Sequence, residues 1–575
     1  MSRRNRVYAC AAVSALMLAA ALVAGSCGKV GVTRYYKRGM VVTVSPLASE
    51  IGRQIIQEGG NAFDAAVAVG FALAATYPQA GNIGGGGFAT IRDGATGEIS
   101  VLDFRETAPG AAAREMFLDS AGEVKAGRST RGALAAGVPG TVAGLYALWE
   151  KRGTMKWEDL VTAAARLADT GFTVDKILAS DFAQYQEQLS EFETTRQLFV
   201  PNGITPREGE RWQQPDLAHS LYAIAEVGPA AFYTGLIADS LVSCMSQYGG
   251  LISYADLEHY QPVWRQPLHY RFDSLDIYSV PPPSSGGIIV GQILKLLEPY
   301  DFSKFAPDSP EYIHLFCEAS RLAFADRAEH LGDPAYFTVP PKLLDSAYLA
   351  DRRILISLEH AGASDDTGPG NPWKYESGQT THYSICDSQG NMVAVTTTIN
   401  EYFGSGLVVG GCGFLLNNEM DDFAIKPGYA NVYGLIGNEA NAVAPGKRML
   451  SSMSPTLILK DGRPFMILGS PGGSRIINTV AQAIINFTRF GLSLDETAKR
   501  PRFHHQWLPD KIDLEQGGYD VVTIQRLIRY GHEVEERTPY GDLKMIYIGP
   551  AGMMTGASDW RCGGLAAGCE APIVK

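Results

Sequence analysis

The sequence has 575 residues, of which 46% are hydrophobic and 19% are charged, and its mean hydropathy is close to zero. This is ordinary globular composition, sufficient for one large core or for several domains. The formal net charge is −12, and a surface of that sign repels nucleic acid and anionic lipid, so we exclude nucleic acid as a partner.

The first 27 residues have the layout of a secretory signal. Arg3, Arg4 and Arg6 precede an apolar, Ala-rich run over 11–24 that is shorter than the ~20 residues needed to span a bilayer. The ending Ala24-Gly25-Ser26-Cys27 resembles a bacterial lipoprotein cleavage site. We therefore expect an exported protein, periplasmic or an outer-membrane lipoprotein with a lipid on Cys27. Plain signal-peptidase cleavage nearby is the alternative. Removal of the leader lowers the net charge from −12 to about −15, because it holds three arginines and no acids.

The cysteine and histidine patterns predict neither a metal nor a cofactor. An exported protein can form disulfides, and Cys562 and Cys569 are close enough in sequence to pair. There is no C-x-x-C motif. His504-His505 is the one histidine doublet, and adjacent residues on a strand point to opposite faces, which favours packing over metal binding.

Helices and strands alternate along the first two thirds of the chain. Apolar residues at helical spacing predict helix over 51–77, with Asn61 capping a second, buried helix and Pro78 ending it. Gly84 to Gly87 lead into a short strand, and without a following lysine they favour close packing over phosphate binding. Further strands are expected at 99–104 and 276–280, further helices at 141–151, 157–170 and 312–328, and another helix after the turn 281–287.

The pattern changes after a polar, turn-rich stretch. Residues 361–378 are the candidate processing loop, because exposed segments of this kind are where chains are cut. Two β-hairpins follow, 382–387 with 391–399 and 456–459 with 465–468, and then a helix over 475–490. Helices before and after two groups of strands predict an α/β sandwich.

The first hairpin places two threonines face to face. If its turn is centred on Gln389, the numbers of paired residues sum to 778, so Thr380 lies opposite Thr398, and Asn400 falls one step beyond. A second hydroxyl can hold the Oγ of a threonine nucleophile, and β-branching limits its rotamers. Without other evidence, a plain Thr-rich strand pair remains the alternative.

The tract GQTTHYSICDSQGNMVAVTTTIN at 378–400 closely resembles the bacterial-type γ-glutamyltransferase family. Other matching motifs occur in family order over nearly the whole chain: NIGGGGF at 82–88, DFRETAP at 103–109, LNNEMDDF at 416–423, KRMLSSMSPT at 447–456, GSPGGSR at 469–475 and PRFHHQWLP at 501–509. The resemblance implies an N-terminal-nucleophile hydrolase fold of four αββα layers. It also implies autocatalytic cleavage between Gln379 and Thr380.

The implied product is a heterodimer of a large subunit, 28–379, and a small catalytic subunit, 380–575, which together form one structural domain. Thr380 would be the nucleophile, activated by its new α-amine. It would take the γ-glutamyl group of glutathione or a related γ-glutamyl compound and pass it to water, an amino acid or a dipeptide.

The resemblance also implies roles for individual residues. The substrate α-carboxylate would be bound by Arg105, Ser451 and Ser452, because arginine offers a bidentate fork to a carboxylate. The substrate ammonium would be bound by Asn400, Glu419 and Asp422, whereas Asp421 is expected to be structural. Gly472 and Gly473 precede a helix and would supply oxyanion donors. The lid over the site would lie between Lys426 and Lys447 and include Tyr433.

Other functions stay open. An acylase of the same fold, acting on β-lactam side chains, is one alternative, and a non-catalytic lipoprotein that binds γ-glutamyl peptides is another. The absence of a G-x-S-x-G motif disfavours a serine hydrolase. The family motif G-A-S-D-P-R occurs here as GASDWR, with Trp560 in place of proline.

Overall fold

The computed structural model describes residues 34–368, 381–426, 429, 431, 439–569 and 573–574. The predicted leader with Cys27, the predicted cleavage site Gln379–Thr380 and Tyr433 of the predicted lid lie outside the described residues.

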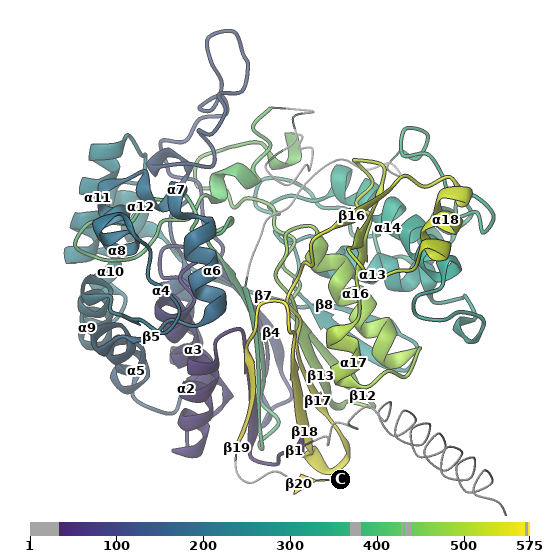
Figure 1. Ribbon diagram of the computed structural model, residues 1–575, viewed down its shortest axis with the longest axis horizontal. Helices are drawn as coiled ribbons and strands as arrows, with labels where there is room; N and C mark the ends of the chain where they lie inside the picture. The colour runs from purple at the N-terminus through teal and green to yellow at the C-terminus, as the bar shows by residue number, and fades with distance from the viewer. Residues whose placement is uncertain are drawn as a thin grey trace, which may run out of the picture.

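Two stacked antiparallel sheets form the centre of the molecule (Figure 1). The seven-stranded sheet has the order β19 (Leu565–Cys569), β2 (Gly39–Thr43), β10 (Thr381–Asp387), β11 (Met392–Thr398), β3 (Gly86–Arg92), β4 (Ile99–Asp103), β7 (Val263–Arg265). The six-stranded sheet has the order β18 (Met554–Ser558), β17 (Lys544–Ile548), β13 (Arg463–Gly469), β12 (Thr456–Lys460), β9 (Leu275–Ser279), β8 (Leu268–Phe272). Smaller sheets are formed by β14 (Phe503–His504), β15 (Ile512–Glu515) and β16 (Val534–Arg537), by β5 (Phe172–Thr173) and β6 (Arg211–Trp212), and by β1 (Arg34–Tyr35) and β20 (Ile573–Val574).

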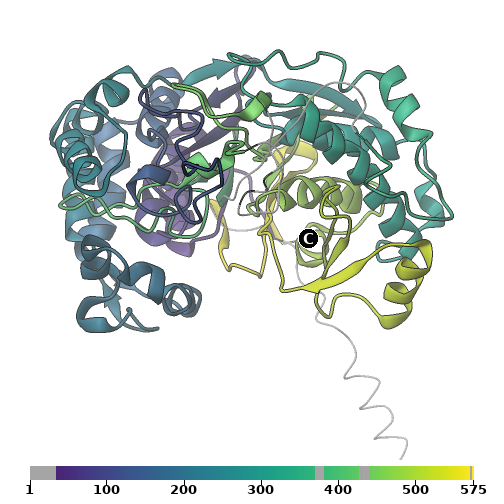
Figure 2. The same ribbon diagram turned by 90° about the horizontal axis from the view of Figure 1, so that it is seen from above.

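Helices cover the outer face of each large sheet, as both views of the ribbon show (Figures 1 and 2). On the side of the seven-stranded sheet lie α2 (Pro46–Gln57), α3 (Ala62–Thr76), α4 (Thr141–Arg152), α5 (Trp157–Thr170), α6 (Lys176–Gln184), α7 (Gln186–Ser190), α8 (Glu193–Phe199), α9 (Pro215–Val227), α10 (Ala230–Tyr233), α11 (Leu236–Tyr248) and α12 (Tyr254–His259). On the other side lie α13 (Gly286–Leu297), α14 (Pro310–His330), α15 (Ser346–Arg353), α16 (Arg475–Thr488), α17 (Leu494–Lys499) and α18 (Val521–Tyr530). Single 3₁₀ turns are η1 (Ala133–Ala135), η2 (Pro201–Gly203), η3 (Phe302–Lys304), η4 (Glu419–Asp422), η5 (Glu439–Asn441) and η6 (Pro550–Gly552). The predicted αββα architecture is confirmed.

Both large sheets combine strands from the two sides of position 380. In the seven-stranded sheet, β10 and β11 lie between β2 and β3, which come from the first hundred residues. In the six-stranded sheet, β12 pairs with β9. Chain segments before and after the predicted cleavage site therefore share one backbone hydrogen-bond network, so neither could keep its sheet without the other.

The register of the β10–β11 hairpin is the predicted one. The described pairs run from Thr381↔Thr397 to Cys386↔Met392, and every pair sums to 778. The five-residue turn fixes this register because the Asp387 carboxylate accepts hydrogen bonds from the backbone amides of Gln389 and Asn391, at 2.9 and 3.1 Å. The predicted pairing of Thr380 with Thr398 lies outside the described residues.

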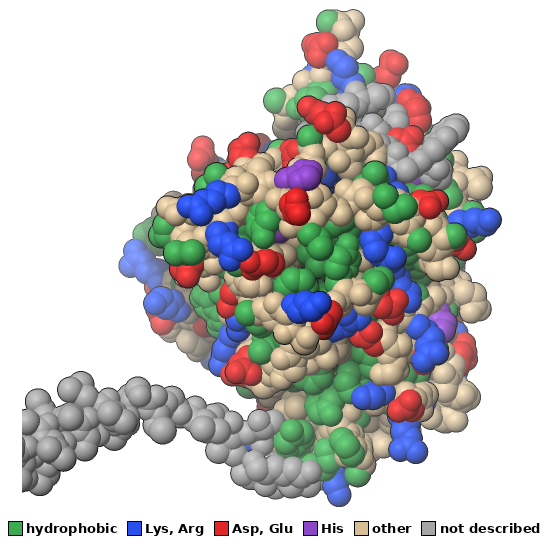
Figure 3. All heavy atoms as spheres, turned by 90° about the vertical axis from the view of Figure 1, so that its right-hand side faces the viewer, with side chains coloured by type: hydrophobic (Ala, Val, Ile, Leu, Met, Phe, Trp, Pro, Cys, Tyr) green, Lys and Arg blue, Asp and Glu red, His purple; other side chains and the backbone are tan. Residues whose placement is uncertain are grey.

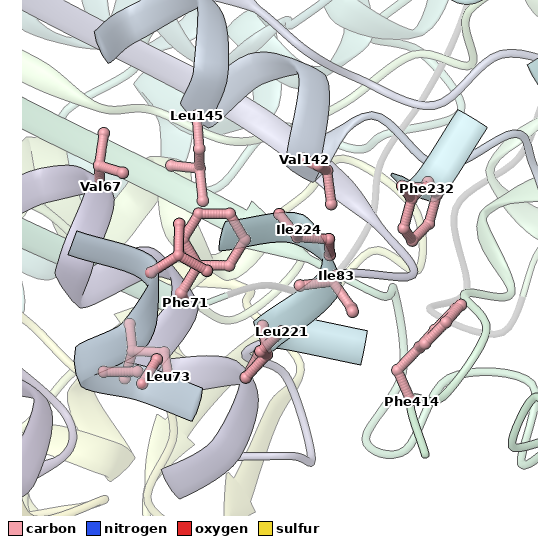
Figure 4. Packing of buried hydrophobic residues seen from close by; sticks show 14 of the residues in the cluster. Val67, Phe71, Leu73, Ile83, Val142, Leu145, Leu221, Ile224, Phe232 and Phe414 are labelled. Carbon is pink, nitrogen blue, oxygen red and sulfur yellow. The ribbon is translucent and has the colours of Figure 1, made fainter. Parts of the chain in front are cut away.

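The predicted pair of helices near the N-terminus is confirmed as α2 and α3, with Gly59–Gly60 between them. The first helix begins at Pro46, earlier than the expected start at residue 51. Asn61 caps α3, since its side chain accepts from the amides of Phe63 and Asp64 while the Asp64 carboxylate accepts from the amide of Asn61. All of α3 is buried, and Phe71 packs among apolar side chains of α4 and α9 (Figure 4).

The structure also shows how the cysteines near the C-terminus and Trp560 are accommodated. Cys562 and Cys569, which are close enough in sequence to pair, are not joined by a disulfide. The Cys569 thiol faces the carbonyl of Arg53 at 3.6 Å, whereas Cys562 lies 4.0 Å from the hydroxyl of Tyr402. Trp560 is 54% exposed, which explains how the departure from proline fits: its neighbours Asp559 and Arg561 stay buried in ion pairs.

The candidate processing loop is firmly held in its first part. Ser364 is buried: its amide donates to Asp510 at 2.7 Å, its hydroxyl to the carbonyl of Trp507 at 2.6 Å. The Trp507 indole in turn donates to the carbonyls of Ser364 and Thr367. Residues 361–368 are thus anchored to the region after position 500, which the polar composition of this stretch did not predict.

The surface carries charges of both signs. On the face to the right in Figure 1, acidic and basic side chains alternate with apolar ones (Figure 3). Among the described residues, no helix is long and apolar enough to cross a membrane.

Candidate functional site

Arg105 is the centre of a buried cluster of charges. It follows β4, and its guanidinium lies 2.5 Å from Glu419 and 3.5 Å from Glu106, and it also pairs with Asp422. All four side chains are at most 1% exposed. Arg105 is therefore not part of a surface salt bridge. Glu419 and Asp422 come from η4, so the fold brings together two motifs that are distant in sequence.

Burial governs the protonation of this cluster. It raises the pKa of Glu106, Glu419 and Asp422 above their ordinary values, although the charge of Arg105 opposes this rise. Burial alone would lower the pKa of Arg105, but the three carboxyl groups outweigh it and raise that pKa. One guanidinium faces three carboxyl groups, so ionisation of all three would leave an excess of negative charge, which a cationic ligand would offset.

The end of β11 leads directly to this cluster. The Thr398 hydroxyl accepts from the amide of Asn400 at 2.7 Å and is one of the groups that lower the pKa of Glu419 against the larger effect of burial. Asn400 has φ = 72°, a left-handed conformation that asparagine tolerates better than most residues. Its side chain donates to the carbonyl of Asn418 at 3.0 Å, which holds η4 against the strand end. Asp421, by contrast, accepts from Ser129 at 2.6 Å, as expected for a structural residue.

The loop that contains Ser451 and Ser452 lies along the other side of Arg105. The guanidinium is 3.4 Å from the carbonyl of Met449 and 3.5 Å from that of Leu450. Both serines are buried, and the Ser452 hydroxyl accepts from Arg327 of α14 at 2.9 Å. Ser451 pairs with the turn before α13, where its carbonyl accepts from the amide of Ser285 at 2.7 Å.

The glycine turn after β13 lies close to the start of β10. A Cβ on Gly469 would be 2.4 Å from the ring of His382, so only glycine allows this approach. Gly472 and Gly473 follow with φ = 130° and 62°, and their carbonyls accept the first amide hydrogens of α16. A turn of this kind at a helix N-terminus can bind an anion through backbone N–H groups.

The structure therefore gathers most of the predicted residues and adds others. One connected set of contacts joins Arg105, Thr398, Asn400, Glu419, Asp422 and the loop of Ser451–Ser452. Gly472–Gly473 lie on the turn after β13, and Thr380, Gln379 and Tyr433 fall outside the described residues. Sequence reasoning missed Glu106, Arg327 and Asn441. Glu106 could have been found from its place beside Arg105 in DFRETAP, but nothing in the sequence marks Asn441.

One group of side chains could hold a metal ion among the residues that the structure describes: His314, Glu318 and His532. These side chains already satisfy one another and their neighbours. The two histidines are hydrogen-bonded at 2.8 Å, and Glu318 pairs with Arg321 at 3.1 Å. The doublet His504-His505 is likewise engaged, with Asn478 and with Asp510.

We expect Arg105→Gln to reduce the free energy of unfolding by about 3 kcal/mol at neutral pH, because it leaves buried carboxylates without a counter-ion. The loss should shrink as the pH falls. In the variant the folded-state pKa values of these groups rise further above their unfolded values, so the folded state binds more protons, and its stability declines as pH rises. Urea midpoints at pH 5 and 7.5 measure this.

The matched control is Arg114→Gln, which breaks an exposed pair with Glu439. An exposed pair contributes little, so this variant should resemble the unaltered protein at both pH values. Equal midpoints for the two variants would contradict the assignment of a stabilising charge to Arg105.

Comparison with known proteins gives one consistent result. The family model for gamma-glutamyltranspeptidase matches residues 48–569. The glutathione hydrolase proenzyme of Escherichia coli (strain K12) is 47% identical over 527 residues, covering 91% of this chain and 90% of that protein. Among solved structures, a cephalosporin acylase from Bacillus halodurans superposes with a TM-score of 0.84 at 27% identity over 95% of this chain and 98% of its own. A gamma-glutamyltranspeptidase chain from Helicobacter pylori gives 0.56 at 40% identity over 60% and 96%. The chain belongs to the gamma-glutamyltranspeptidase family.

Proposed function

We propose that this protein cleaves itself between Gln379 and Thr380 and then hydrolyses or transfers the γ-glutamyl group of glutathione and related compounds. The observation that carries the proposal is the buried Arg105–Glu419–Asp422 cluster, which lies beside Thr398 at the end of β11. Membership of the family and the similarity to a glutathione hydrolase proenzyme support it.

Autocleavage would proceed by an N-to-O acyl shift. The Thr380 hydroxyl attacks the carbonyl carbon of Gln379, the C–N bond breaks, and an ester forms as the proton moves to the released amine. Water then hydrolyses the ester, which leaves a carboxylate on Gln379 and a free amine and hydroxyl on Thr380. The products are a large subunit of residues 28–379 and a small subunit of residues 380–575, held together by the two shared sheets.

Catalysis would use the same hydroxyl. The α-amine of Thr380 accepts its proton as the oxygen attacks the γ-carbonyl of the donor, and Thr398 holds the attacking oxygen. Amides of Gly472 and Gly473 stabilise the oxyanion. The leaving amine takes the proton, and a γ-glutamyl ester of Thr380 remains. Water or the amine of an amino acid or dipeptide then attacks this ester and regenerates Thr380.

Substrate recognition would replace one set of ion pairs by another. In the described site Arg105 is paired with Glu419 and Asp422. A glutamyl head offers a carboxylate for Arg105, Ser451 and Ser452, and an ammonium for Asn400, Glu419 and Asp422. The incoming zwitterion thus supplies both partners, and its ammonium offsets the excess of carboxyl groups. Tyr433 would belong to a lid that covers the bound donor.

Thr380→Ala should abolish autocleavage, because no hydroxyl remains to attack Gln379. Intact mass after incubation at neutral pH measures this: two chains, the second beginning at Thr380, for the unaltered protein and one chain for the variant. Thr381→Val is the matched control, since its buried hydroxyl has no hydrogen-bond partner among the described residues and adjacent strand positions face opposite sides of the sheet. Two chains from Thr380→Ala would refute the proposal.

The acylase alternative predicts a different donor preference. Its support is the superposition with a cephalosporin acylase, whose 27% identity is well below the 47% to the glutathione hydrolase proenzyme. We expect kcat/KM for γ-glutamyl-p-nitroanilide to exceed that for glutaryl-p-nitroanilide roughly 10²-fold or more, because the glutaryl donor lacks the ammonium that Glu419 and Asp422 would bind. Similar values for the two donors would favour an acylase.

We propose further that the protein is exported and carries a lipid on Cys27, in the periplasm or on the outer membrane. The basic start, the apolar run over 11–24 and the ending Ala24-Gly25-Ser26-Cys27 support this. Cys27→Ala should move the enzyme from the membrane fraction to the periplasmic fraction of the producing cells, with Cys10→Ala as the control. Equal membrane fractions for both variants would contradict lipidation.

A further inference from the structure

A short segment, residues 439–447, which we call the strap, lies against the substrate-binding cluster. It begins with η5 and ends at Lys447, just before the loop of Ser451 and Ser452. Glu439 is exposed, whereas Ala440, Asn441 and Ala442 are buried. The strap runs beside the segment after η4, because the amide of Ala424 donates to the carbonyl of Asn441 at 2.9 Å.

Asn441 joins the two sides of the site. Its side chain is fully buried, and its Nδ2 donates to the carbonyl of Asp422 at 2.6 Å while its Oδ1 accepts from the amide of Leu450 at 3.0 Å. Arg105 bridges the same two segments from the other side, through the carboxylate of Asp422 and, at 3.5 Å, the carbonyl of Leu450. Arg105, Asp422, Asn441 and Leu450 therefore form a closed ring of polar contacts.

Lys447 fixes the backbone on both sides of Asn441. Its buried ammonium donates to the carbonyl of Ala440 at 2.8 Å and to that of Ala442 at 2.9 Å. These two carbonyls flank Asn441 directly in sequence. The side-chain amide of Asn441 is thus held in a fixed position between η4 and the loop of Ser451 and Ser452. A residue that only filled space would not require such fixed placement.

We propose that Asn441 is a positioning residue that sets the distance between the ammonium-binding and carboxylate-binding halves of the glutamyl pocket. The inference rests on the proposed function. Among the described residues, the Asn441 side chain bonds to the backbone of Asp422 and of Leu450, so it acts through Asp422 on one side and through the loop of Ser451 and Ser452 on the other. An amide suits this place because it offers one donor and one acceptor at a fixed separation, whereas a carboxylate would offer two acceptors.

This role has a consequence that general destabilisation lacks. A γ-glutamyl donor contacts both halves at once, so its affinity depends on their spacing. A glutaryl donor lacks the ammonium and contacts only the carboxylate half, so the spacing matters little for it. Loss of the positioning by Asn441 should therefore weaken the binding of the zwitterionic γ-glutamyl donor selectively.

The test compares Asn441→Ala with Glu439→Ala, a control at the exposed start of the same strap. For Asn441→Ala we expect KM for γ-glutamyl-p-nitroanilide to rise about tenfold, as for the loss of a buried hydrogen bond, with kcat within about twofold and unchanged autocleavage. The preference for the γ-glutamyl over the glutaryl donor should fall by the same factor of about ten. Glu439→Ala should match the unaltered enzyme.

Lys447→Met provides a second, independent route to the same result. It removes the ammonium that holds the carbonyls on either side of Asn441 but keeps the amide and most of the side-chain volume. The same selective rise in KM is expected, and this variant decides the matter if Asn441→Ala fails to fold. An unchanged KM, or an equal loss for both donors, would overturn the inference.

The outcomes separate this inference from the proposed function. If the unaltered enzyme shows no preference for γ-glutamyl donors, the proposed function is wrong, and so is the positioning role of Asn441. If that preference is present in the unaltered enzyme and fully retained in Asn441→Ala, only the positioning role of Asn441 is contradicted.

Discussion

The pairing of β10 inside the seven-stranded sheet is the constraint on which the rest of the structure depends. β10 is bonded to β2 on one side and to β11 on the other, and all its residues are buried. These two ladders fix the point where the strand begins, so a reactive group placed there needs no further support from the chain before it. They also tie together segments from both sides of position 380. A cut at that position can therefore release a new N-terminus without releasing a subunit.

The site next to this strand combines strong charge with little freedom to move. Arg105 and its three carboxyl partners are buried in the protein interior. Away from water, electrostatic interactions are stronger and unpaired charges are costly. Backbone-directed contacts hold the surrounding segments in place: Asn400 holds η4 against β11, and Asn441 holds it against the serine loop. A ligand with one positive and one negative group can replace the internal ion pairs, whereas a neutral acyl group would leave them unchanged.

Much of the fold could be predicted because its signals are local. The helix over 157–170 has the bounds of α5, and the turn at 387–391 fixed the hairpin register as expected. Errors arose where the outcome depends on distant partners. The polar stretch 361–368 looked like a loose loop, but Ser364 is buried against Trp507 and Asp510. The spacing of Cys562 and Cys569 left open whether they pair, and in the fold their thiols face different neighbours. Glu106 stands beside Arg105 in the sequence, but only the structure shows that both side chains are buried.

The sequence by itself determined the order of helices and strands, the hairpin register and the family, because periodicity, turn residues and motifs are written in short segments. It also indicated which polar residues belong to the site, through resemblance. Only the tertiary structure decided how these residues meet. Arg105 and Asp422 are 317 residues apart, and their contact exists because β4 and η4 are packed into one body. The same is true of Asn441, whose partners Asp422 and Leu450 lie on separate segments. Such contacts depend on the folding of all four layers together, and no local pattern records them.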